Sequence, residues 1–189
     1  YHGSSGSGGR TLNNGSVLLW QGTGNLLLGD GAQVINAPTG YLDIRNAATV
    51  GYTGFGNPGV VTNDGTLLKS GAGTTTIAQP FVQNHTGTTI VSAGTLAFTS
   101  TFTNNHGSFL LDKGAALSVP GALTLGNGYL TGWGTVTAPG GVSAGSYFLP
   151  TQLTIVGNLT LEHSAFSSFE LAGLHQGLGG AALPSGGAR

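Results

Sequence analysis

The fold is decided by a short stretch that occurs three times, as Gly15-Ser-Val-Leu-Leu19, Gly40-Tyr-Leu-Asp-Ile44 and Gly65-Thr-Leu-Leu-Lys69. Each copy is an apolar, strand-like run opened by a glycine, and the three opening glycines are evenly spaced. The same spacing returns at Gly107, Gly132 and Gly157, whereas Gly94-Thr-Leu-Ala-Phe98 lies out of phase between the two sets. Self-similarity at a fixed period, here about 25 residues, indicates a repeat architecture in which each period is one structural unit.

The segments between these glycines predict strands and turns. Apolar runs of about four or five residues are separated by Gly, Asn, Asp and Pro, which favour turns. The period is shorter than a propeller blade of about 40 to 45 residues, and no helical periodicity is present. The sequence therefore predicts an all-β fold, a right-handed parallel β-helix (β-solenoid) with coils of about 20–25 residues.

In such a solenoid, one strand register points equivalent side chains inward. We expect the second residue after each coil glycine to be buried, namely Val17, Leu42, Leu67, Phe109 and Leu159. Asparagine and glycine mark the expected corners, as in Asn14-Gly15 and Asn63-Asp-Gly65, because both tolerate a positive φ angle. The expected organisation is a flexible segment at 1–10, the solenoid at 11–173 and a Gly/Ala-rich tail at 174–189.

Composition excludes several classes of function. Charged residues make up 6% of the 189 residues, and the five dispersed Lys and Arg residues provide no basic surface for nucleic acid. The chain has no cysteine, which excludes disulfides, thiolate metal sites and cysteine nucleophiles. No apolar run reaches the length of about 18 residues that a membrane-spanning helix needs. With 39% hydrophobic residues, the chain can still form a sizeable core.

Two parts of the chain resemble a known family. Thr86-Gly-Thr-Thr-Ile-Val-Ser-Ala-Gly-Thr-Leu-Ala-Phe98 resembles the strand repeat of bacterial autotransporter passenger domains, in which a Gly-Thr-Thr strand precedes a Gly-Thr-Leu strand. The closing coils of secreted or surface-anchored bacterial solenoids are similar to Gly132-Trp-Gly-Thr-Val136, Pro139-Gly-Gly-Val-Ser-Ala-Gly145, Leu153-Thr-Ile-Val-Gly-Asn-Leu-Thr-Leu161 and Phe169-Glu-Leu-Ala-Gly173. The tyrosine-aspartate strand that follows in those relatives is replaced here by a glycine-rich tail. The resemblance implies a secreted protein of the bacterial cell surface.

Two glycine motifs match nucleotide-binding and hydrolase patterns. Gly54-Phe-Gly-Asn-Pro-Gly59 matches G-x-G-x-x-G, and Gly141-Val-Ser-Ala-Gly145 matches the G-x-S-x-G nucleophile elbow. Both patterns need a helix directly after the motif, either to aim amide groups at a pyrophosphate or to present the serine. Extended or turn-like residues are expected after each motif here. We therefore predict no cofactor-binding residue and no hydrolase triad.

Titratable residues form no recognisable site in the sequence. Neither the i, i+2 strand spacing nor the i, i+4 helical spacing that brings two imidazoles to one metal occurs among His2, His85, His106, His163 and His175. Lyases and hydrolases of polysaccharides need carboxylates that converge on one groove. No shared coil phase is found for Asp43, Asp64 and the Asp112-Lys113 pair. The sequence predicts no catalytic residue, no metal ligand and no cofactor, and therefore no enzyme.

Two binding functions remain open. Exposed aromatic side chains can stack on sugar rings without any charge, although Trp20 and Trp133 are first expected at core or corner positions. Threonine pairs on a flat solenoid face can order water in an ice-like pattern, and the threonines considered are Thr74, Thr76, Thr99, Thr101 and Thr124. Their phase argues against ice binding, because they fall where the glycine register breaks.

The expected function is that of a non-catalytic extracellular structural or adhesive β-solenoid, acting as a surface stalk or as a filament or matrix subunit. The alternative is a carbohydrate-binding or carbohydrate-active β-helix protein, with surface glycans as partners. Strand edges at the ends of a solenoid recruit other chains unless they are capped. Because the sequence shows no amphipathic helical cap, we expect self-association through the solenoid ends.

Overall fold

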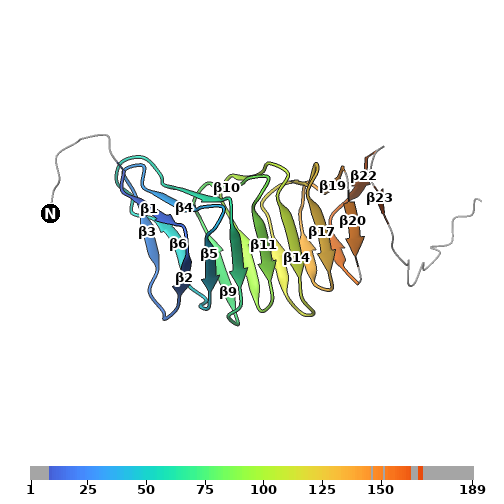
Figure 1. Cartoon of the computed structure of the whole chain (residues 1–189), viewed down its shortest axis with the longest axis horizontal. Helices are drawn as coiled ribbons and strands as arrows, with labels where there is room; N and C mark the ends of the chain where they lie inside the picture. Colours follow the sequence, from blue (N-terminus) through green and yellow to red (C-terminus); the bar gives the residue numbers. More distant parts are fainter. Residues whose placement is uncertain (1–8, 146, 151, 163–165, 168–189) are drawn as a thin grey trace, which may run out of the picture.

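The protein is a three-faced β-solenoid whose strands stack along one axis (Figure 1). The computed structural model describes residues 9–145, 147–150, 152–162 and 166–167. Every strand pairing in these residues is parallel, and none of them is helical. The predicted all-β parallel solenoid is confirmed.

Each turn of the chain adds one strand to each of three faces. Face 1 begins with β1 (Thr11–Asn14), β4 (Gln33–Asn36), β7 (Val60–Asn63), β10 (Phe81–Gln83) and β13 (Phe102–Asn104), and continues with β16 (Leu123–Thr124), β19 (Val142–Ala144) and β22 (Leu159–Leu161). Face 2 holds β2 (Val17–Trp20), β5 (Tyr41–Ile44), β8 (Thr66–Lys69), β11 (Thr88–Val91), β14 (Ser108–Leu111), β17 (Tyr129–Gly132), β20 (Tyr147–Pro150) and β23 (Phe166–Ser167). Face 3 holds β3 (Leu26–Leu28), β6 (Thr49–Tyr52), β9 (Thr74–Ile77), β12 (Thr95–Phe98), β15 (Ala116–Ser118), β18 (Thr135–Thr137) and β21 (Thr154–Val156).

The length of chain in one turn varies along the solenoid and is shortest near its C-terminal end. On face 1, Gln33 pairs with Val60 in an early turn, whereas Val142 pairs with the much closer Leu159 in a late turn. Strands at both ends are similarly short, so the corners between faces account for most of the difference. Coils of about 20–25 residues therefore describe the first turn and the middle of the molecule, whereas the second turn is longer and the C-terminal turns are shorter.

The even spacing of the glycines has a structural basis in one turn only. On face 2, Tyr41 pairs with Thr66, which aligns the two runs that follow Gly40 and Gly65. The second glycine set does not align, because Gly132 is the last residue of β17 on face 2 and Gly157 precedes β22 on face 1. The equal spacing of these later glycines is a coincidence of unequal corner lengths.

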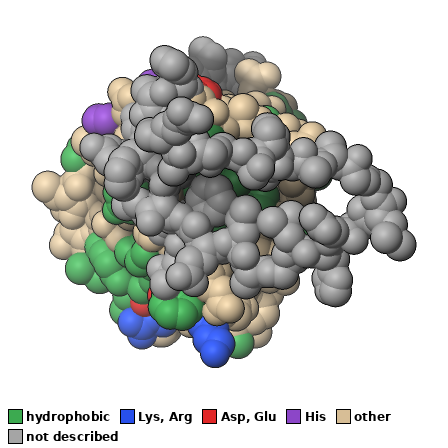
Figure 2. All heavy atoms as spheres, turned by 90° about the vertical axis from the view of Figure 1, so that its right-hand side faces the viewer, with side chains coloured by type: hydrophobic (Ala, Val, Ile, Leu, Met, Phe, Trp, Pro, Cys, Tyr) green, Lys and Arg blue, Asp and Glu red, His purple; other side chains and the backbone are tan. Residues whose placement is uncertain are grey.

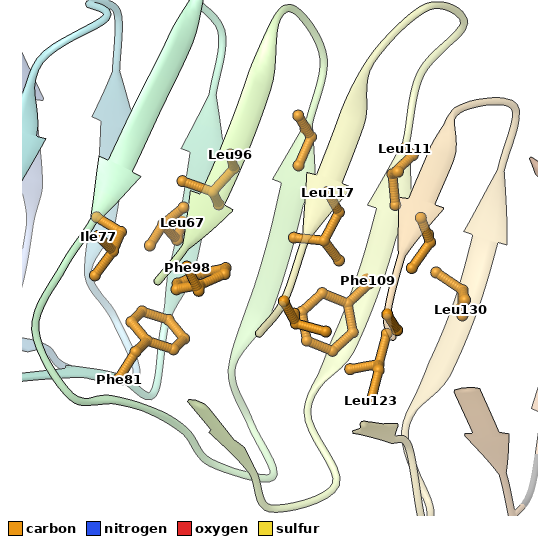
Figure 3. Close-up of a cluster of buried hydrophobic side chains, with 14 of the residues drawn as sticks. Leu67, Ile77, Phe81, Leu96, Phe98, Phe109, Leu111, Leu117, Leu123 and Leu130 are labelled. Atoms are coloured by element: carbon orange, nitrogen blue, oxygen red, sulfur yellow. The ribbon is translucent and has the colours of Figure 1, made fainter. Parts of the chain in front are cut away.

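The core between the three faces is mostly apolar, with a few buried polar side chains such as Thr89. Figure 3 shows Leu67, Phe109 and Leu130 of face 2 pointing into the same interior as Phe81 of face 1 and Leu96 of face 3. We call a row of equivalent side chains on successive strands of one face a rank, inward if it points into the core and outward if it points away. One inward rank of face 2 contains Leu18, Leu42, Leu67, Thr89, Phe109, Leu130 and Phe148. Three expected core residues are confirmed, since the exposed fractions of Leu42, Leu67 and Phe109 are 7%, 1% and 0%.

The other two expected core residues are exposed, Val17 by 66% and Leu159 by 39%. Val17 pairs with Tyr41 and points outward, because the first turn on face 2 is shorter than the glycine spacing and places Leu18 in the inward rank. Leu159 pairs with buried Val142 and shares its register, but it lies in the last described strand of face 1. At this end of face 1, Leu159 stays partly exposed despite its inward register, because no further described strand stacks on it.

A ladder of buried side-chain amides lines the corner between faces 1 and 2. Asn14 Nδ2 donates to Asn36 Oδ1, and Asn36 Nδ2 donates to Asn63 Oδ1, each at 2.8 Å. Asn63 Nδ2 continues the ladder to Gln83 Oε1 at 3.3 Å. These side chains are at most 9% exposed. The expected role of asparagine at the corners is corrected: Asn14 and Asn63 do not have a positive φ, and their amides satisfy one another between turns.

Glycine is needed at the same corner for close approach of successive turns. A Cβ atom on Gly65 would lie 2.3 Å from the carbonyl oxygens of Ala37 and Gly40, and one on Gly87 would lie 2.3 Å from the oxygen of Asn63. Contacts this short are prohibitive, so the turns stack only if these positions lack a side chain.

The expected domain boundaries remain predictions. Strands occur from Thr11 to Ser167, inside the expected solenoid of 11–173. Most of the segment 1–10 and all of the tail 174–189 lie outside the described residues, as do His2, His163 and His175.

Candidate functional surfaces

Lys69 is a lysine inside the solenoid. It lies in the inward rank of face 2 between Ile44 and Val91, is 0% exposed, and donates from Nζ to the carbonyl oxygen of Gly71. Burial lowers the pKa of Lys69 because the ammonium group loses its water, and the charge of Asp43 opposes this effect only in part. Strand parity places Lys69 on the same side as Leu67, two residues earlier, but a lysine is ordinarily expected in solvent.

Asp43 contacts two groups at the neighbouring corner. Although it lies in the outward rank of face 2, it is 2% exposed. Arg45 Nε donates to Asp43 Oδ2 at 2.5 Å, and Ser70 Oγ of the next turn donates to Oδ1. Half of the Arg45 side chain is exposed, so water screens this ion pair and its stabilisation is at most about 1 kcal/mol.

We expect the substitution Lys69→Met to change how stability depends on pH. Between the lowered pKa of folded Lys69 and the ordinary value of 10.5, the unfolded chain binds a proton that the folded chain has lost. The free energy of unfolding of the original protein therefore rises with pH across this window. The methionine variant lacks that titration, so its stability relative to the original protein should fall as pH rises toward 10.5.

Urea denaturation at a series of pH values measures this difference. The matched control is Lys113→Met, because Lys113 is exposed in the corner after β14. If the difference in free energy of unfolding between the Lys69→Met variant and the original protein does not change with pH, Lys69 is not a buried, destabilised ammonium group.

Two histidines that are far apart in the sequence lie in successive turns at the corner of faces 1 and 2. The ring centroids of His85 and His106 are 6.2 Å apart, with an interplanar angle of 72°. Sequence spacing alone did not indicate this pair, because stacking of turns brings together residues that are far apart in the sequence. His106 Nδ1 accepts the backbone N–H of Asn127 at 2.9 Å, so neutral His106 carries its proton on Nε2. In this tautomer neither ring nitrogen of His106 has a free lone pair with which to bind a metal together with His85.

The carboxylates considered in the sequence lie at different places. Asp43 is on face 2, Asp64 is at the corner of faces 1 and 2, and Asp112 is in the turn after β14. Asp64 Oδ1 accepts a hydrogen bond from Asn84 Nδ2 at 2.5 Å, and Asn84 Oδ1 accepts one from Asn105 Nδ2 at 3.1 Å. In the described part of the chain, no three histidine or acidic side chains are grouped as metal ligands would be.

The two glycine motifs lie in the solenoid framework. Gly54–Gly59 forms the loop between β6 and β7, where Gly54 and Gly56 have φ angles of 84° and 65°. Gly141–Gly145 surrounds strand β19, and its Ser143 is in the outward rank and donates to Glu162 Oε1. Neither motif is followed by a helix, so each sequence match has the structural role of a turn or strand.

The two tryptophans differ in their surroundings. Trp20 lies in the inward rank of face 2, packs against the core and donates from Nε1 to the carbonyl oxygen of Gly24 at 3.3 Å. Trp133 is 49% exposed in the corner between β17 and β18. The expected core or corner position is confirmed for both.

The N-terminal end of the solenoid is apolar. A cavity of about 160 Å³ lies inside the first three turns, and its lining includes Leu12, Leu18, Trp20 and Leu26 of the first turn. Leu12 is in the inward rank with Val34 but remains 45% exposed. Figure 2 views the opposite end, where the coloured Lys, Arg, Asp and Glu side chains are few and lie at the periphery.

Comparisons with known proteins identify no relative. No family model, curated protein or solved structure matches the chain. Among the described residues, no helix of the length and apolarity needed to cross a membrane is present.

Proposed function

We propose that this chain is a non-catalytic extracellular scaffold, structural or adhesive, whose copies join end to end. The observation that carries the proposal is the apolar N-terminal end, where core side chains of the first turn remain partly exposed. A neighbouring copy would bury this surface. Such burial stabilises the contact by about 25 cal/mol of free energy for each Å² of apolar area removed from water. The low charge content and the absence of cysteine and methionine suit a durable exterior material.

The strand edges support the same proposal. Strands β1, β2 and β3 are each the terminal strand of their sheet, so each has one edge without a strand partner among the described residues. At the other end, β22 and β23 are the terminal strands of faces 1 and 2. A following copy in the same orientation would place its β1 on β22 and its β2 on β23, continuing both faces. Such a head-to-tail contact does not close on itself and extends into a filament.

The carbohydrate-binding alternative has weaker support. Among the described aromatic side chains, Tyr52 and Phe55 are exposed near one another at the end of β6. On face 2, by contrast, Tyr41 and Tyr129 are separated by several turns, with Thr66, Thr88 and Ser108 between them in the same rank. Sugar-binding surfaces need aromatic rings that one glycan can contact together. The exposed apolar end is therefore the better basis for a function.

We expect the full-length chain to form concentration-dependent linear assemblies at micromolar concentration. The substitution Leu12→Lys places a charge at the partly exposed mouth of the apolar end. Burying that charge in an end-to-end contact is costly, so the dissociation constant should rise about tenfold or more. Sedimentation velocity and electron microscopy of negatively stained samples measure the assembly.

The matched control is Val82→Lys, because Val82 is in the outward rank of β10 in the middle of face 1. This variant should assemble like the original chain. A monodisperse monomer at tens of micromolar would refute end-to-end assembly, and equal loss of assembly in both variants would show that the contact is not at the N-terminal end.

A further inference from the structure

Face 3 presents two outward ranks in which threonine is the most frequent residue. One rank contains Thr74, Thr95, Ala116, Thr135 and Thr154, and the other contains Thr49, Thr76, Ala97, Ser118, Thr137 and Val156. None of these side chains carries a charge. The remaining positions hold small or β-branched residues, so no long side chain interrupts the surface within the two ranks.

The phase argument made from the sequence alone is wrong for this face. That argument grouped Thr74 and Thr76 of face 3 with three threonines that do not belong to this face. Thr99 and Thr101 lie between β12 and β13, and Thr124 is on face 1. The threonines of face 3 align through turns of unequal length, since the turn that pairs Thr74 with Thr95 is longer than the turn that pairs Thr135 with Thr154. Register, not a fixed sequence period, aligns them on one face.

Among the residues that the structure describes, the hydroxyl groups of these two ranks form no hydrogen bond to protein atoms. In the part of the chain that the structure describes, the hydroxyls of Thr74, Thr95 and Thr135 have no protein hydrogen-bond partner. Threonines elsewhere are used internally: Thr39 Oγ1 donates to the oxygen of Gly15 at 2.9 Å, and Thr86 Oγ1 donates to that of Asp64 at 2.7 Å. The hydroxyls of face 3 are therefore available to bind water in a repeated pattern.

Strand geometry gives this pattern two regular repeats. Neighbouring strands place equivalent residues about 4.7–4.9 Å apart, and alternate residues of one strand, such as Thr74 and Thr76, are about 6.6–6.8 Å apart. The spacing between neighbouring strands is close to the shorter oxygen repeat of ordinary hexagonal ice, whereas the spacing along a strand is somewhat below the longer repeat. β-Branched side chains have few rotamers, so ordering them on a lattice costs little entropy.

We propose that face 3 binds the surface of ice. The threonine hydroxyls anchor water molecules at positions that continue the lattice, and the methyl groups between them limit competing arrangements of water. The inference is independent of end-to-end assembly, because it uses the side of the solenoid and not its ends. If copies of the chain join end to end, face 3 becomes longer and its two spacings stay the same.

Incorporation into growing ice tests the proposal. The full-length chain, fluorescently labelled at its N-terminus, is mixed with a labelled reference protein while a polycrystalline ice hemisphere grows slowly. The original chain should be enriched in the ice relative to the reference, and it should also slow recrystallisation of small ice grains. Replacing Thr95 and Thr135 together by tyrosine puts two large rings on the flat face and should reduce incorporation about tenfold or more.

The matched control is the double substitution Thr62→Tyr and Thr103→Tyr, whose positions lie in the outward rank of face 1. Circular dichroism confirms that each variant keeps its β structure. The proposal is supported if the face 3 variant loses its enrichment in ice and the face 1 variant keeps it. Exclusion of the original chain from ice, or an equal effect of both double substitutions, overturns it.

Discussion

Replacing Phe109 by alanine should lower the free energy of unfolding by about 3–5 kcal/mol. The Phe109 side chain is 0% exposed and its ring centroid is 6.2 Å from that of Phe102, which belongs to a cluster with Phe81 and Phe98. It lies between Thr89 and Leu130 in the inward rank of face 2, and Figure 3 shows it beside Leu130. Truncation removes contacts to the turns on both sides, and a rigid ladder cannot collapse to fill the space.

Denaturation in urea, followed by circular dichroism, measures this loss. The control is Phe55→Ala, because Phe55 is 74% exposed in the loop between β6 and β7, and its effect should stay within about 0.5 kcal/mol. Because stacked turns couple mainly to their neighbours, Phe109→Ala should also broaden the transition. A loss below about 1 kcal/mol would show that the packing around Phe109 is not as described.

The substitution Asn63→Asp is expected to destabilise the protein by an amount on the order of 3–5 kcal/mol at about pH 7. Asn63 is 0% exposed; its Oδ1 accepts from Asn36, and its Nδ2 donates to Gln83 Oε1 and to the oxygen of Thr88. A carboxylate keeps the acceptor but loses both donors, so oxygen faces oxygen in a buried site.

The effect of this substitution should depend on pH. Burial raises the pKa of the new carboxyl group above its unfolded value, so the stability cost increases as pH rises from the unfolded pKa to the folded pKa. The loss should therefore be smaller at about pH 4 than at about pH 7. Asn57→Asp is the control, because Asn57 is exposed and contributes its backbone oxygen to the hydrogen bond with Gly31. An equal loss for both variants would mean that the amide ladder does not stabilise the fold.

The sequence allowed the fold class to be predicted because a solenoid repeats one local pattern. Short apolar runs with small corner residues occur in almost every turn, and the alternation within a run identifies which residues can share a side. Leu42 and Leu67 were predicted as core residues for this reason, and both are buried. Glycines 40 and 65 were identified as corner residues, and close approach of the next turn is the reason they are needed.

The positions that could not be predicted depend on how one turn aligns with the next. Val17 was assigned inward from the even glycine spacing, but the first turn of face 2 is shorter by a single residue, which exchanged Val17 with Leu18. Strand side chains alternate with a period of two, so an error of one residue in turn length moves every side chain of that strand to the opposite side. Corner loops vary in length without disturbing the strands, so the local pattern does not reveal the error.

By itself, the sequence determined that the chain builds stacked parallel strands, that its core is apolar, and that small residues mark its corners. Only the tertiary structure decided which residues become neighbours between turns: the amides of Asn36 and Asn63, the rings of His85 and His106, and the outward threonines of face 3. The physical reason is that interstrand hydrogen bonds set the register, and they join residues far apart in the sequence through corners of unequal length. Local propensity shapes each strand, whereas the candidate surfaces are formed by the alignment of many turns.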